Sequence, residues 1–173
     1  PEPLIPVGHE IAYEQFRLPI EPGERTFATG GPALKVSAEG NELTASSSKV
    51  NFVFDKKTGL VSSYKVSGTE YFKDGFGLQP NFWRAPNDND YGNGNPKRLQ
   101  VWKQSSKNFN VVDANIVMDG KDAVLTANYL LAAGNLYIVT YRISPSGVVK
   151  ADFTFTSTDM EAAKTEASEA TLM

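Results

Sequence analysis

Residues 80–94 read PNFWRAPNDNDYGNG and separate two blocks in which apolar and polar residues alternate. The stretch contains two prolines, two glycines and four asparagines, so we expect neither a helix nor a regular strand within it. It also contains three aromatic residues, for which a disordered linker has little use. The composition therefore predicts an ordered irregular loop, held by its rings and by ionic and hydrogen-bonding side chains.

Residue types alone leave two interpretations of this loop. In the structural interpretation, Arg84 pairs with Asp88 or Asp90 and the rings cover the end of a sheet. In the functional interpretation, the loop faces a ligand. A calcium loop of the helix-loop-helix type is excluded, because Asn93 stands where that pattern needs glycine and Leu99 where it needs glutamate.

The composition restricts the classes of function. The chain has 173 residues, enough for one sizeable domain or one domain plus a fragment. A net charge of -3 argues against nucleic acid as a partner, and no apolar run approaches the length of a membrane span. The absence of cysteine excludes thiolate metal sites, and the single histidine, His9, excludes any site that needs two histidines.

The start of the chain shows no signal peptide, and its first residue, Pro1, indicates a piece of a longer protein. The compartment is not readable from this sequence, and bacterial cytoplasm and periplasm both stay open.

Alternation of apolar and polar residues predicts β-strands on both sides of the central stretch. The predicted strands are residues 34–38, 43–47, 50–54, 60–66 and 69–72 before it, and 109–118, 123–131, 136–144 and 148–157 after it. Gly59 ends a predicted hairpin loop and is expected in the left-handed conformation. Strands and turns at this regular spacing predict a β-sandwich.

One short helix is expected after the central stretch. Asn95 is placed at its cap and Pro96 at its first position, with Leu99 and Trp102 forming an apolar edge. Residues 158–173 are rich in alanine, glutamate and threonine but have no cap and no amphipathic stripe, so we expect a loop or a frayed end there.

Residues 81–92, NFWRAPNDNDYG, closely resemble the signature that opens the C-terminal domain of the β-galactosidases of glycoside hydrolase family 2. Residues 9–16 resemble the last strand of the immunoglobulin-like domain that precedes that domain, and residues 52–60 resemble the hairpin that enters its sheet. The resemblance covers nearly the whole chain. It implies that residues 1–32 are the remnant of the immunoglobulin-like domain (domain 4) with a linker. Residues 33–173 would be the first part of the C-terminal small-chain domain (domain 5).

The fold implied by this resemblance is all-β. It is a twisted antiparallel β-sandwich of the galactose mutarotase-like supersandwich type, truncated, with one short helix after the central loop. The implied function is that of a non-catalytic fragment of an enzyme that hydrolyses terminal β-D-galactosides. Retaining hydrolysis needs two carboxyl groups about 5–5.5 Å apart, and in this family a barrel domain, absent here, supplies both as glutamates.

Two local patterns resemble catalytic groups, but neither has the structural environment that catalysis would need. Gly40-Asn41-Glu42 matches the triplet that carries the family's acid/base glutamate, but it lies in a predicted hairpin and is assigned to a turn. Asp88 and Asp90 form a close carboxyl pair, yet no apolar pocket is readable that would raise the pKa of either. The chain alone is therefore expected to be inactive.

The resemblance assigns the central loop two roles. The rim of the sugar site would be formed by Tyr91, Gly92, Asn93 and Gly94, whose glycines allow a hinge. The structural anchors of the signature would be Trp83, Arg84, Pro86, Asp88, Asn89 and Asp90. Some enzymes of the family have a longer rim segment than the brief one at residues 93–96 of this chain.

No cofactor or metal ligand is expected in this chain, although parent enzymes of the family often use Mg²⁺ and Na⁺ through ligands outside the fragment. The expected partner is the rest of the polypeptide, chiefly its barrel domain, and a galactoside binds only in the complete enzyme. Strand edges left without partners, around residues 11–18 and 148–155, predict a homodimer through exposed edges. The alternative is that residues 1–32 fold back over the sandwich.

Two other functions fit parts of the sequence. A free-standing carbohydrate-binding module would use Trp83, Tyr91 and Trp102 as stacking platforms, although core aromatic residues look identical in sequence. A structural or adhesion β-sandwich fits everything except the specificity of the central signature.

Overall fold

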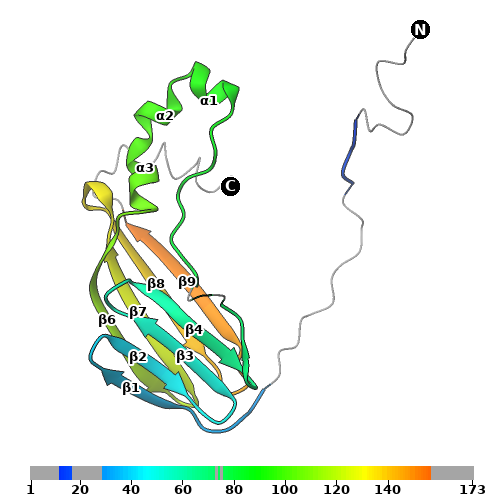
Figure 1. Cartoon of the computed structure of the whole chain (residues 1–173), viewed down its shortest axis with the longest axis vertical. Coiled ribbons are helices and arrows are strands. Elements are labelled where there is room, and N and C mark those ends of the chain that lie inside the picture. The colour runs from blue at the N-terminus through cyan, green and yellow to red at the C-terminus, as the bar shows by residue number, and fades with distance from the viewer. Residues whose placement is uncertain (1–11, 17–28, 73, 75, 157–173) are drawn as a thin grey trace.

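The computed structural model describes residues 12–16, 29–72, 74 and 76–156, and within them two antiparallel sheets pack face to face (Figure 1). The first sheet consists of β1 (Lys35–Glu39), β2 (Glu42–Ser46), β3 (Val50–Asp55), β4 (Leu60–Val66) and β5 (Thr69–Glu70). The second consists of β6 (Asn110–Asp119), β7 (Asp122–Leu130), β8 (Leu136–Ile143) and β9 (Val149–Thr156). The predicted all-β sandwich is confirmed, because each of the nine strands predicted around the central stretch, from residue 34 to residue 157, matches an observed strand to within two residues at either end.

The core lies between the sheets because inward and outward residues alternate along each strand. The inward side chains of β3, β7 and β8 are Val50, Phe52, Phe54, Ala123, Leu125, Ala127, Tyr129, Tyr137, Val139, Tyr141 and Ile143. Alanines lie between larger residues on β7, so rings from neighbouring strands have room to interdigitate. Phe52 and Tyr141 meet across the sheets with their ring centroids 5.5 Å apart.

Two tyrosines tie one sheet to the turns of the other. The hydroxyl of Tyr129 donates to the carbonyl oxygen of Gly59 at 2.8 Å, and the hydroxyl of Tyr64 donates to that of Gly147. Burial, followed by the neighbouring tyrosines, raises the pKa of Tyr129. Its hydroxyl therefore stays protonated and acts as a donor over the whole neutral range.

The turns follow the sequence predictions. Gly59 has φ +71, the left-handed conformation expected for it. Gly40, with φ +55, and Asn41 form the tight connection between β1 and β2, and Glu42 is an exposed residue of β2 that faces Glu39. The triplet resembling a catalytic glutamate motif is therefore a hairpin turn, as predicted.

The helical content differs from the prediction. Three short helices follow one another beyond one end of the sheets (Figure 1). They are α1 (Asp88–Gly92), α2 (Asn95–Arg98) and α3 (Gln100–Ser105); a 3-10 turn, η2, covers Ala132–Gly134. The expectation of a single helix after the loop was wrong, as was the expectation that residues 80–94 contain none.

Local hydrogen bonding explains α1. The side chain of Asn87 accepts a hydrogen bond from the backbone N–H of Asp90, whose carboxylate accepts one from the backbone N–H of Asn87. This reciprocal capping box satisfies two donors at the helix start. Gly94, at φ +76, caps α2, so Asn95 is the first helical residue rather than the cap. Leu99 interrupts the helix and separates α2 from α3.

Several predictions fall partly or wholly outside the described residues. Of the strand expected at residues 11–18, only Ala12–Phe16 is described, and this segment belongs to no helix or strand. The tail at residues 158–173 lies outside. The boundary between residues 32 and 33 stays a prediction. Within the described part of the chain, the helices are too short and too polar to cross a bilayer.

Candidate functional site

The central loop is fastened by one forked ion pair. Nη1 of Arg84 lies 2.6 Å from Oδ2 of Asp90, and Nη2 lies 2.8 Å from Oδ1. The Asp90 side chain is 9% exposed, whereas that of Arg84 is 51% exposed. Hydrogen bonds from Arg84, and then from the backbone of Asn87, hold the pKa of Asp90 well below its usual range. Of the two partners considered from sequence, the structure selects Asp90, because Asp88 is exposed and contacts neither nitrogen.

The same carboxylate connects the first two helices. Oδ1 of Asp90 accepts a hydrogen bond from Nδ2 of Asn95 at 3.2 Å, and Oδ1 of Asn95 accepts one from Arg98. The chain therefore passes out to an exposed corner between Asp90 and Asn95 and returns. The hydrogen bonds of Asp90 and Asn95 therefore hold both ends of the corner in place.

The four residues predicted at the sugar rim form that exposed corner. Tyr91 is 65% exposed and Gly92 ends α1. Asn93 accepts a hydrogen bond from the backbone N–H of Asn95 at 3.0 Å. Gly94 has φ +76, and a Cβ placed there would meet no atom within 4 Å. The structure brings these residues together in a position open to a ligand, while their role at a sugar site stays a prediction.

The aromatic residues of this region differ in their surroundings. Trp102 packs against Phe82 and Phe155, with ring centroids 6.1 Å and 5.5 Å away, so it belongs to a cluster at the end of the sandwich. Trp83 is half-buried, and the ammonium group of Lys103 lies 6.0 Å from its ring centroid. Of the predicted anchors, Pro86 is half-buried and Asn89 is exposed.

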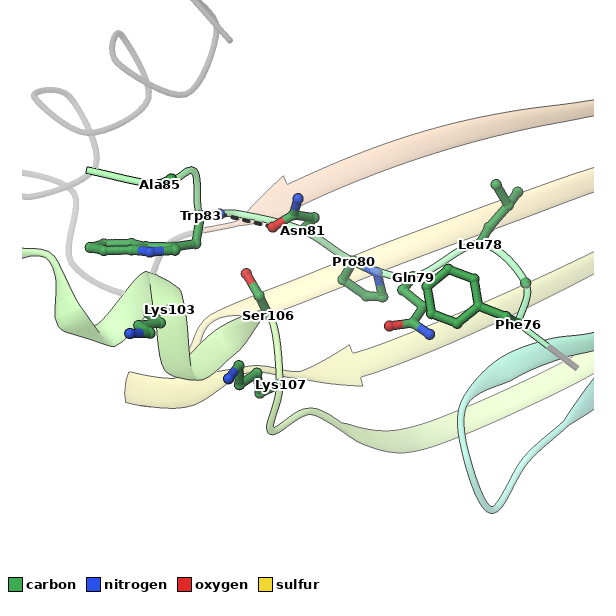
Figure 2. Close-up of a pocket in the computed structure, with 11 residues that line it drawn as sticks. Phe76, Leu78, Gln79, Pro80, Asn81, Trp83, Ala85, Lys103, Ser106 and Lys107 are labelled. Atoms are coloured by element: carbon green, nitrogen blue, oxygen red, sulfur yellow. Dashed lines mark hydrogen bonds between the residues drawn. The ribbon is translucent and has the colours of Figure 1, made fainter. Parts of the chain in front are cut away.

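A groove of about 700 Å³ runs beside Trp83. One wall is the extended segment at residues 76–81, and the other residues that line it are Trp83, Ala85, Lys103, Ser106 and Lys107 (Figure 2). Pro80, Asn81 and Ala85 belong to the central stretch singled out in the sequence, but of the lining residues Trp83 alone was among the predicted anchors; Phe76, Gly77, Leu78, Gln79, Lys103, Ser106 and Lys107 were missed. The alternation of Phe76, Leu78 and Pro80 was a signal for one wall, but nothing in the sequence placed that wall beside the end of α3.

Comparison of the sequence with known proteins places the chain in a family. The model described as "Beta galactosidase small chain" matches residues 46–169, which include the whole signature. The chain belongs to the β-galactosidase small-chain family. The resemblance inferred from residues 81–92 is thereby confirmed.

Three relatives agree with the family. The chain is 34% identical over 145 residues to a β-galactosidase of Priestia megaterium, covering 83% of this chain and 14% of that protein. It is 30% identical over 130 residues to a β-galactosidase of Kluyveromyces lactis and 32% identical over 127 residues to one of Klebsiella pneumoniae. These matches cover 72% and 71% of this chain and 12% of each relative. The chain thus spans a small part of the relatives' length, consistent with a fragment of a larger polypeptide.

The forked pair at Arg84 gives a first test of the anchor in this family member. Arg84→Lys keeps the charge but loses the two parallel hydrogen bonds, so we expect the Tm to fall by a few degrees. The matched control is Arg142→Lys, because Arg142 contacts two exposed or half-exposed carboxylates singly, at 2.8 and 3.4 Å. Differential scanning calorimetry measures both. An Arg84→Lys variant that melts with the wild type would contradict the anchor role.

Proposed function

We propose that this chain is a non-catalytic part of a β-galactosidase that hydrolyses terminal β-D-galactosides. It supports the barrel domain of the same polypeptide and contributes residues 91–94 to the rim of the sugar site. The observation that carries the proposal is the exposed corner at Tyr91–Gly94, held at both ends through Asp90, within a signature found in β-galactosidases.

The carboxyl groups of this region support a non-catalytic role. A retaining glycosidase needs one carboxyl group with a raised pKa and a second that attacks the sugar. The pKa of Asp90 moves in the opposite direction, and its oxygens already accept hydrogen bonds from Arg84, Asn87 and Asn95. Its carboxylate is therefore committed to the fold rather than to proton transfer.

The side chains of the exposed corner are suited to contact a sugar at the rim of its site. The phenol of Tyr91 can bind a hydroxyl group at its tip and cover the apolar face of a pyranose with its ring. The side-chain amide of Asn93 supplies a donor in addition to the oxygen that it uses locally. Gly94 tolerates the φ/ψ changes that a closing rim requires. The resemblance implies Mg²⁺ and Na⁺ for parent enzymes, with ligands outside this chain.

The chain alone should not hydrolyse a chromogenic galactoside such as o-nitrophenyl β-D-galactoside, because the barrel glutamates are missing. Activity that co-purifies with the chain and disappears in Asp88→Asn would overturn this expectation.

A chimeric enzyme tests the role of the chain in a complete β-galactosidase. In it, residues 46–169 replace the matching segment of the Priestia megaterium enzyme. We expect the chimera to retain turnover, and Tyr91→Ala in it to raise KM for the galactoside. A folded, inactive chimera would contradict the proposal.

Free sugar should bind weakly or not at all. A single exposed corner buries too little of a monosaccharide to offset the entropy lost on immobilising it. Titration with galactose and lactose, followed by tryptophan fluorescence, should give no saturable signal at low millimolar concentration. Saturation that is lost in Trp83→Ala would favour a free-standing carbohydrate-binding module, because Trp83 borders the groove.

A further inference from the structure

The exposed corner between α1 and α2 (Figure 1) contains the one asparagine–glycine pair of the sequence, Asn93-Gly94. Both residues are exposed, and a Cβ placed on Gly94 would meet no atom within 4 Å. In such a pair the backbone nitrogen of glycine can attack the side-chain amide carbon of asparagine, because glycine has no side chain to obstruct the approach. Nucleophile and carbon belong to neighbouring residues, so the attack closes a five-membered ring within the chain.

One hydrogen bond prepares the carbon that would be attacked. Oδ1 of Asn93 accepts from the backbone N–H of Asn95 at 3.0 Å. Negative charge develops on this oxygen during the attack, so a donor already directed at it lowers the barrier. Within the described residues, Nδ2 of Asn93 donates no hydrogen bond. The group that must leave is therefore not held by the fold.

The attacking nitrogen is held back by a single long hydrogen bond. The N–H of Gly94 donates to the carbonyl oxygen of Tyr91 at 3.2 Å, which in the described part of the chain is the one hydrogen bond of the peptide group joining Asn93 to Gly94. The ψ angle of Asn93 is 1°, which places this nitrogen beside the backbone nitrogen of Asn93 rather than beside its side chain. A rotation about ψ breaks the hydrogen bond and brings the nitrogen to Cγ, and glycine tolerates such a change.

We propose that Asn93 is a self-modification site, at which the chain converts asparagine to aspartate and isoaspartate at a rate set by the hydrogen bonds of the corner. Hydroxide removes the proton of the Gly94 nitrogen, which bonds to Cγ of Asn93. The Cγ–Nδ2 bond breaks, and Nδ2 takes up a proton and leaves as ammonia. Water then opens the ring. Cleavage of the new bond to Cγ gives aspartate, and cleavage of the original peptide bond gives isoaspartate. One water is consumed for each ammonia released.

The product changes the connection between the first two helices. Isoaspartate routes the backbone through the former side chain and adds one carbon atom to the path from Asp90 to Asn95. These two side chains are joined by a hydrogen bond of 3.2 Å, which we expect the longer path to disrupt. The inference goes beyond the proposed function and does not depend on it, because the product is read as a covalent change in the chain itself.

Neighbouring asparagines provide matched controls within the same molecule. Asn95 precedes Pro96, which has no N–H and so no nitrogen that can be deprotonated for attack. Asn89 is exposed, as Asn93 is, but the N–H of the following residue, Asp90, donates to the side chain of Asn87 at 3.1 Å. Asp90 also carries a side chain where Gly94 has none. Asn89 and Asn95 should therefore stay unmodified while Asn93 reacts.

Peptide mapping by mass spectrometry tests the proposal on the full chain, kept folded at raised pH and sampled over time. We expect aspartate and isoaspartate to accumulate at Asn93 before any other asparagine, and faster at higher pH. Asn93→Gln should abolish the signal, because its ring would be six-membered and would form far more slowly. Asn95→Ala keeps the N–H directed at Asn93 and removes the link to Asp90, so it should raise the rate about fivefold, as expected for losing one hydrogen bond.

Three results would overturn the proposal. An Asn93 that stays intact throughout the incubation would exclude the reaction. Equal modification of Asn89 and Asn93 would show that neither Gly94 nor the open corner matters. A rate that is unchanged in Asn95→Ala and equal to that of the chain unfolded in urea would exclude control by the hydrogen bonds of the corner. Circular dichroism of each variant confirms that the sandwich is intact before incubation.

Discussion

Gly77→Ala is expected to cost about 3 kcal/mol or more of unfolding free energy, because overpacking against backbone cannot be relieved by turning a side chain. A Cβ at this position would lie 2.0 Å from the carbonyl oxygen of Val61 and 3.1 Å from Cδ2 of Phe72. Val61 is completely buried in β4 and pairs with Phe54 of β3, so the oxygen has little freedom to move. Either the groove wall lifts away from the sheet or β4 shifts out of its ladder.

Equilibrium denaturation in urea measures this cost. The matched control is Gly92→Ala, because a Cβ there would meet nothing within 4 Å and Gly92 lies in a short helix with no positive φ. Alanine is also the better helix former, so the control should be neutral or slightly stabilising. A Gly77→Ala protein with an unchanged midpoint would show that Gly77 does not lie against the Val61 carbonyl as described.

Tyr129→Ala is expected to cost about 3–5 kcal/mol, the range for removing a large aromatic side chain from a core. Tyr129 is 2% exposed, and its ring contacts Phe109 and Tyr137 with centroids 5.7 Å and 5.9 Å away. The side chain also links β7 to the turn at Gly59. Its removal would leave a cavity between the sheets and a carbonyl oxygen without its donor.

Tyr129→Phe separates these two contributions. It keeps the ring and loses only the hydrogen bond to Gly59, so the expected cost is about 1 kcal/mol. Tyr91→Ala serves as the control, since Tyr91 is largely exposed and its loss should leave stability unchanged. If Tyr129→Phe lowered the free energy of unfolding as much as Tyr129→Ala, the cavity would not be the main cause of the loss in stability.

The strands were predictable because burial on one face imposes a period of two, and Val50, Phe52 and Phe54 show that period without tertiary information. The helix α1 was missed for a local reason. The prolines and glycines of residues 80–94 were weighed over the whole stretch, whereas Asn87 and Asp90 stand at the spacing of a capping box. The break at Leu99, a half-buried residue with φ -102 and ψ 17, is marked by no glycine or proline at that position in the sequence.

The site was predictable to the level of residue types. Arg84 was expected to pair with a nearby aspartate, but choosing Asp90 over Asp88 needed the helix that turns one carboxylate inward and the other outward. The groove was not predictable, because its two walls come from residues about twenty-five positions apart. Trp83 and Trp102 looked equivalent in sequence, yet only Trp83 borders the groove.

The order of strands has a consequence for how the chain folds. Within the residues that the structure describes, every hydrogen-bonded pair of strands joins neighbours in sequence, from β1 with β2 through to β8 with β9. Short turns close each hairpin, so little loop-closure entropy is lost before pairing contributes. In this described part of the chain, the distant step is the packing of the two sheets against each other, since the helical segment separates them in sequence. We therefore expect faster folding than in Greek-key sandwiches of similar size, whose strands pair across long connections.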